Sequence, residues 1–95
     1  MNVAGAVEAR EVKDEHVSGL QGQYANSFQI GYRLYEVVFD FGQVDTEKDA
    51  VRWHARIIMS PLYAKDLCKT LAEALRLYEE EHGLIPDDDV EESEG

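Results

Sequence analysis

The sequence predicts an α+β fold in which an antiparallel meander of three or four strands is followed by one long C-terminal amphipathic helix packed on the sheet. Two observations lead to this prediction. From Val51 to Met59 apolar residues stand at every second position, which is the period of a strand. From Pro61 to His82 they recur every three or four residues, which is the period of an amphipathic helix. The period changes at Ser60-Pro61, so we expect the last strand to run directly into the helix.

The two ends of the chain are predicted to lie outside the folded domain. Residues 1–15 mix small and charged residues without a sustained period, which predicts a flexible N-terminus. Residues 86–95 are mostly acidic, and we expect them to form a disordered tail. The single α+β domain is therefore placed at residues 16–85. Residues 16–22 are a candidate fourth strand at the sheet edge, although two glycines weaken that assignment.

Two further strands are expected before residue 51. Residues 24–32 alternate large residues with small or polar ones, and residues 35–43 carry their aromatic side chains at odd positions. Odd positions are also apolar in residues 51–59, so antiparallel pairing must match odd with odd to keep a single buried face. The opposite face then carries side chains of both charges: Glu36, Asp40, Arg52, His54 and Arg56.

The helix is expected to begin at Pro61 and to end at His82. Ser60 suits the N-cap position, and Pro61 suits the first helical position because its missing N–H has no partner there. Gly83 provides the stop, since glycine tolerates the positive φ at which many helices end. The apolar residues of the helix form one seam, which we expect to face the sheet: Ala64, Leu67, Cys68, Leu71, Ala74, Leu75 and Tyr78.

Three more apolar residues of this helix lie off the seam, namely Leu62, Tyr63 and Leu77. A three-stranded sheet cannot cover all of this apolar surface, and a core of about sixty residues is marginal by itself. We therefore expect a homodimer, formed either by helix packing or by joined sheet edges. The three off-seam residues are the possible partner or dimer surface.

The charge distribution restricts the range of partners. The formal net charge is −11, and six acidic but no basic residues follow Gly83. The folded part is only mildly acidic and carries no basic stripe, which argues against nucleic acid as a partner. No apolar run is long enough to cross a membrane, and no leader opens the chain. We therefore expect a small acidic protein of the cytoplasm that has no membrane partner.

No constellation of residues indicates an active site. The three histidines fall in separate elements without the spacing typical of metal ligands. Cys68 is the only cysteine and lies on the apolar seam, so we expect a buried thiol and not a nucleophile. Glu36 and Asp40 lie on a face with arginines, which favours ion pairing over acid–base catalysis. We expect no catalytic residue, no metal site and no cofactor.

Five short segments occur together in a distinctive order and spacing: Tyr24-Ala25-Asn26, Glu36 to Phe41, Ala55 to Pro61, Ala64 to Leu67, and Tyr78-Glu79. In these segments, residues 23–83 resemble an uncharacterised prokaryotic family of small proteins known only as a domain of unknown function. The resemblance implies the succession of strands and a helix described above, and a bacterial or archaeal origin. It implies no activity, cofactor or catalytic residue.

Three classes of function are compatible with the sequence. The first is a small homo-oligomeric protein-binding or adaptor module without catalytic activity, and it agrees best with the surplus of apolar surface. The second is a holdase-like chaperone, because acidic dimers with apolar grooves can bind unfolded proteins. The third, which the sequence favours least, is a single-stranded nucleic-acid binder that uses the aromatic residues of the sheet.

Overall fold

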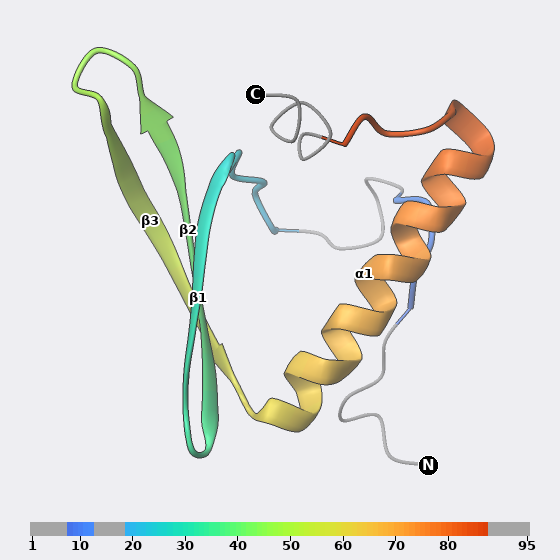
Figure 1. Cartoon of the computed structure of the whole chain (residues 1–95), viewed down its shortest axis with the longest axis horizontal. Coiled ribbons are helices and arrows are strands. Elements are labelled where there is room, and N and C mark those ends of the chain that lie inside the picture. The colour runs from blue at the N-terminus through green and yellow to red at the C-terminus, as the bar shows by residue number, and fades with distance from the viewer. Residues whose placement is uncertain (1–7, 13–18, 88–95) are drawn as a thin grey trace.

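A computed structural model describes residues 8–12 and 19–87 of the chain and confirms the predicted order of elements. A three-stranded antiparallel sheet is followed by one long C-terminal helix (Figure 1). The elements are β1 (Ser27–Arg33), β2 (Glu36–Asp45), β3 (Ala50–Met59) and α1 (Pro61–His82). Residues 19–22 form no strand, and the rest of the candidate fourth strand lies outside the described residues. Most of the predicted N-terminal segment and acidic tail also lies outside them.

The central strand β2 pairs with β1 on one side and with β3 on the other. A two-residue turn joins β1 to β2, so that Arg33 lies opposite Glu36. In the half of the β2–β3 hairpin nearest the helix, odd residues pair with odd residues, as predicted. The pairs are Val37 with Met59, Phe39 with Ile57, and Phe41 with Ala55.

Beyond Phe41 the predicted register is wrong, because a β-bulge shifts the pairing by one residue. Gly42 lies opposite Trp53 and leaves His54 without a partner in the ladder. Successive side chains of a strand point to opposite faces, so one extra residue in β3 makes every later pair match an odd residue with an even one. Arg52 consequently pairs with Gln43 and does not lie opposite Asp40.

The bulge depends on a glycine at position 42. A Cβ atom at this position would lie 2.6 Å from the carbonyl oxygen of Arg52 and 2.8 Å from a methyl carbon of Val51. Real Cβ atoms do not approach a backbone oxygen so closely, so any larger residue forces the two strands apart. Glycine in a strand often marks such a close approach of two backbones.

The segment before β1 is held to the bulge by hydrogen bonds and not by continued strand pairing. The backbone N–H of Asn26 donates to the carbonyl oxygen of Gly42 (3.0 Å), and that of Val44 donates to Oδ1 of Asn26 (3.0 Å). Nε2 of His54 lies 3.2 Å from the carbonyl oxygen of Tyr24. The predicted strand over residues 24–32 therefore begins later, at Ser27, and Asn26 has a structural role.

Local signals set both ends of α1 at the predicted residues. Oγ of Ser60 accepts a hydrogen bond from the backbone N–H of Tyr63 (3.4 Å), which identifies Ser60 as the N-cap. At the other end Gly83 adopts a φ of 98° and donates its N–H to the carbonyl oxygen of Glu79 (3.0 Å). Both ends of the helix are therefore determined by residues within it or next to it.

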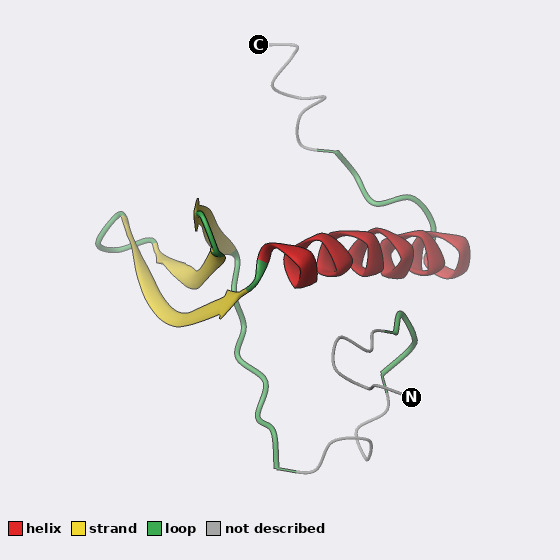
Figure 2. Cartoon of the chain, turned by 90° about the horizontal axis from the view of Figure 1, so that it is seen from below, coloured by secondary structure: helices red, strands yellow, loops and turns green. Residues whose placement is uncertain are grey.

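The helix makes only sparse contact with the sheet, although the sequence predicts that it packs there. The two diverge from their junction at Ser60 like the arms of a V (Figures 1 and 2). No residue of α1 is buried, and the expectation of a buried Cys68 thiol is wrong for this reason. The four buried residues of the described chain all lie in β2: Val38, Phe39, Asp40 and Gly42.

Candidate functional site

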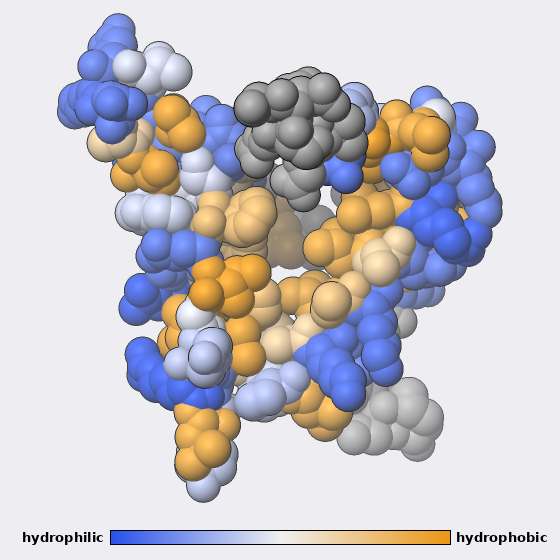
Figure 3. Space-filling model, viewed as in Figure 1, coloured by the Kyte–Doolittle hydropathy of each residue, from blue (hydrophilic) through white to orange (hydrophobic). Residues whose placement is uncertain are grey.

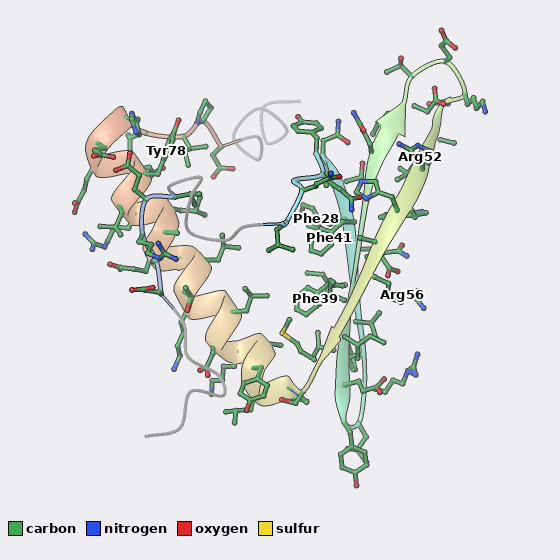
Figure 4. All side chains as sticks on the ribbon, turned by 180° about the vertical axis from the view of Figure 1, so that it is seen from behind. Phe28, Phe39, Phe41, Arg52, Arg56 and Tyr78 are labelled. Atoms are coloured by element: carbon green, nitrogen blue, oxygen red, sulfur yellow. The ribbon has the colours of Figure 1, made fainter. Side chains whose placement is uncertain are left out.

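The V formed by the sheet and the helix has two apolar walls that face each other. We call these walls together the inner surface. Figure 4 shows Phe28, Phe39 and Phe41 on the side of the sheet that is turned toward α1. Figure 3 shows hydrophobic residues on both arms where they face each other across a hollow. The sheet wall consists of Phe28, Phe39, Phe41 and Ile57, which the strand register places on one face. The helix wall consists of Leu67, Leu71, Leu75 and Tyr78, which the helical period places on one stripe of α1.

Most of the inner surface is exposed in the part of the chain that the structure describes. Phe39 is only 8% exposed because the neighbouring strands flank it, and its ring stacks on that of Phe41 at 6.5 Å between centroids. In contrast, Phe28 is 69% exposed, Leu71 54% and Tyr78 50%. Proteins that work as soluble monomers seldom expose contiguous apolar patches of this kind, which usually mark a binding surface.

The residues predicted as a partner or dimer surface do not form one cluster. Leu62 is 65% exposed in the first turn of α1, and Tyr63 lies beside it. Leu77 is separated from Leu62 by about four helical turns, roughly 22 Å along the axis. It is half-buried and lines a hollow with Arg10 and Glu11 of the N-terminal segment.

Sequence reasoning identified the seam of the helix but assigned it to a covered core. In the structure this seam is part of the exposed inner surface. The available signal was the mismatch between the number of apolar residues and the area that three strands can cover. From that mismatch the sequence predicted a partner surface, which it assigned to the off-seam residues Leu62, Tyr63 and Leu77.

On the opposite face of the sheet, Asp40 of β2 forms an ion pair with Arg56 of β3 and accepts a hydrogen bond from Gln29 of β1. Nε of Arg56 donates to Oδ1 of Asp40 (2.7 Å) and a terminal nitrogen donates to Oδ2 (2.9 Å), while Nε2 of Gln29 also donates to Oδ2 (2.9 Å). The hydrogen bond from Arg56, followed by that from Gln29, lowers the pKa of Asp40 to about 2. Asp40 is therefore ionised near neutral pH and holds no proton to transfer. The predicted ion-paired face is confirmed for Asp40 and Arg56.

The remaining polar residues of this face are engaged locally. Arg33 forms an ion pair with Glu36 at 3.3 Å. A shallow hollow lies between these groups, with Gly31 and Val38 among its lining residues. Its two arginines already have carboxylate partners, so they do not form a cationic site.

The described residues contain no group of three or more histidine, cysteine, aspartate or glutamate side chains arranged to hold a metal ion. His54 lies in the bulge, His82 packs against the ring of Tyr78 at 4.8 Å, and His16 lies outside the described residues. The structure thus brings no two of the histidines together in the part of the chain that it describes.

Comparison with known proteins identifies a family but no activity. Within the described residues, no helix has both the length and the apolar character needed to cross a membrane. Searches of curated proteins and of solved structures gave no match. A family model described as a protein of unknown function, DUF3467, matches residues 4–87, which is most of the chain. The chain therefore belongs to the DUF3467 family of proteins of unknown function.

Proposed function

We propose that this chain is the subunit of a homodimeric protein-binding or adaptor module that has no catalytic activity. The observation that supports this proposal is the inner surface, whose two apolar walls face each other and remain largely exposed. Complete burial of one large apolar side chain contributes roughly 1.5–3 kcal/mol relative to leaving it exposed. Several half-exposed residues on each wall therefore represent a substantial driving force for association.

A second copy is the occupant that best suits the inner surface. It supplies both an apolar sheet face for this helix and an apolar helix stripe for this sheet. The eight residues that form the two walls are uncharged, so their burial needs no desolvation of charge despite the net charge of −11. A two-fold arrangement would cover both copies equally, as in most homo-oligomers.

Leu62 and Tyr63 remain as the surface for a second, different protein. On a helical wheel Leu62 lies opposite the seam, so it stays accessible when the inner surface is covered. The negative charge of the chain favours a partner with basic residues around an apolar segment, because complementary charge accelerates association. The proposed dimer thus has two surfaces with different roles. The inner surface serves self-association, and Leu62 with Tyr63 binds the second protein.

Sedimentation equilibrium at micromolar concentration tests the first part of the proposal. We expect a dimer for the wild type and a folded monomer for Leu71→Glu, whose side chain is half-exposed in the single chain. Leu62→Glu is the matched control on the outer side of the same helix and should remain dimeric. A folded wild-type monomer at this concentration would contradict the proposal.

The breadth of the inner surface favours one second candidate, a holdase-like chaperone. A holdase would use its apolar walls to bind unfolded clients of unrelated sequence. Stoichiometric suppression of aggregation for several unrelated proteins, abolished by Leu71→Glu, would support this candidate. Capture of one partner, lost in Leu62→Glu and retained in Leu71→Ala, would support the adaptor instead.

A further inference from the structure

The two edges of the sheet differ in their protection against pairing with another strand. β1 and β3 are the outer strands of the described sheet, and each presents backbone N–H and C=O groups away from β2. β3 carries Arg52 and Arg56 and contains the bulge at His54. Charged residues and bulges are the features by which natural edge strands avoid association. The β3 edge is therefore protected.

The β1 edge lacks this protection. Ser27–Arg33 contains no proline, lysine or acidic residue, and its one charged residue is Arg33 at the end of the strand. Its apolar side chains are highly exposed, at 69% for Phe28, 59% for Ile30 and 87% for Tyr32. An unpaired edge strand with this composition is a typical site for the addition of another strand.

The sequence of β1 is complementary to a second copy of itself in the antiparallel direction. When the pair is centred on Ile30, all seven residues of the strand have partners, and Phe28 lies opposite Tyr32. A shift by one residue would place the apolar side chains of the two copies on opposite faces. Parallel pairing in register would bring the two Arg33 side chains together. The antiparallel pair centred on Ile30 avoids both problems.

We propose that β1 pairs with β1 of a second copy about a two-fold axis at Ile30, which makes one continuous six-stranded sheet. This inference rests on the proposed homodimer and identifies the seam between its subunits. Phe28 and Tyr32 lie on the face of the sheet that contributes to the inner surface, since they pair with Phe41 and Val37. The apolar faces of the two copies therefore join across the seam. Cross-strand pairs of aromatic residues further stabilise such a junction.

Disulfide formation between single-cysteine variants tests the seam and its register. All variants carry Cys68→Ser, because Cys68 is exposed and is the only native cysteine. Cβ atoms directly opposite each other in an antiparallel pair are about 5 Å apart, close to the separation that a disulfide requires. Ile30→Cys should therefore form a disulfide-linked dimer on mild oxidation.

Two further variants fix the register. Phe28→Cys and Tyr32→Cys each lie two residues from the axis, so identical cysteines are about 13 Å apart across the seam. Neither variant should form a linked dimer alone, but a mixture of the two should do so. Cross-linking of Phe28→Cys alone in preference to Ile30→Cys would overturn the proposed register.

A charge placed at the axis provides a second test that does not depend on oxidation. Ile30→Lys brings two positive charges together at the seam and should yield folded monomers. Ile58→Lys is the control for an added charge away from the β1 edge, because Ile58 is similarly exposed at 50% although it lies on the opposite face of the sheet, and it should remain dimeric. A dimeric Ile30→Lys variant would overturn the β1 seam.

Sedimentation of the same samples separates the two proposals. A wild-type monomer would overturn both the homodimer and the seam. A wild-type dimer in which neither Ile30→Cys nor the mixed variants become linked would overturn the seam and leave the homodimer intact. Far-UV circular dichroism of each variant shows that the sheet and the helix have formed.

Discussion

The central strand β2 and the helix α1 differ in how much of their packing comes from their own chain. β2 has a neighbour on each side and contains every buried residue of the described chain. α1 has more than twice as many residues as β2, yet none of them is buried. The sheet is thus largely complete within one chain, whereas the helix has well-formed ends but an uncovered apolar seam.

This difference shows that an element can be fully specified in its secondary structure and still lack its tertiary partner. Backbone hydrogen bonds within a helix need only the helix itself, but burial of its seam needs a second surface. The stability contributed by β2 should therefore not depend on protein concentration. The stability contributed by the seam of α1 should depend on it, as for any association.

The largest effect is expected from Phe39→Ala, which removes the most buried aromatic side chain of β2. Loss of a buried phenylalanine costs about 3 kcal/mol or more, and this loss should be the same at micromolar and nanomolar concentrations. The control Leu71→Ala should destabilise the protein at micromolar concentration and have little effect after dilution to the monomer. Urea unfolding at both concentrations measures the two losses. An equal, concentration-independent loss for both variants would contradict the comparison.

A smaller loss, about 2 kcal/mol, is expected from Gly42→Ala, because the added methyl group meets the backbone of Arg52 and overpacks the bulge. Gly31→Ala in β1 is the matched control, since a Cβ atom there would meet nothing within 4 Å. Its effect should stay within about 0.5 kcal/mol. Thermal unfolding of both variants below the dissociation concentration measures the difference. A neutral Gly42→Ala would mean that the bulge does not need its glycine.

The ion pair between β2 and β3 predicts a pH dependence that belongs to the sheet. The folded-state pKa of Asp40, about 2, lies below its ordinary value of 3.8, so the ionised form is favoured by folding. Its stabilising contribution is fully present above about pH 4 and is lost as the pH falls toward 2. The difference between the urea midpoints at pH 7 and pH 3 should therefore be smaller in Asp40→Asn than in the exposed control Glu47→Gln. Identical pH dependence in wild type and Asp40→Asn would contradict this role.

The smallest effect is expected from Arg52→Gln, which tests the register that the bulge imposes. No ion pair of the described residues involves Arg52, and exposed side chains of this kind change stability by less than about 0.5 kcal/mol. Arg56→Gln should lower the urea midpoint more, because it leaves the carboxylate of Asp40 without its main partner. If the two substitutions had equal effects, the bulge would not separate the roles of the two arginines.

The elements of the fold were predictable where the signals are local. Ser60, Pro61 and Gly83 define the ends of α1 through interactions within a few residues, and the predicted bounds of this helix agree with the structure. Alternation of apolar residues likewise predicted the pairing of Phe39 with Ile57. The bulge was not predictable in this way, because it depends on how closely the backbone of Gly42 approaches that of Arg52 across the hairpin.

The sequence by itself determined the secondary structure, the apolar seam of the helix, the ion pairing of the sheet's polar face and the family to which the chain belongs. Only the tertiary structure decided which apolar residues are covered, because burial depends on the angle between α1 and the sheet. That angle opens from the short junction at Ser60 and leaves the seam of the helix exposed. The tertiary structure also showed that β1, and not β3, is the unprotected edge, since the bulge that protects β3 forms only when the strands meet.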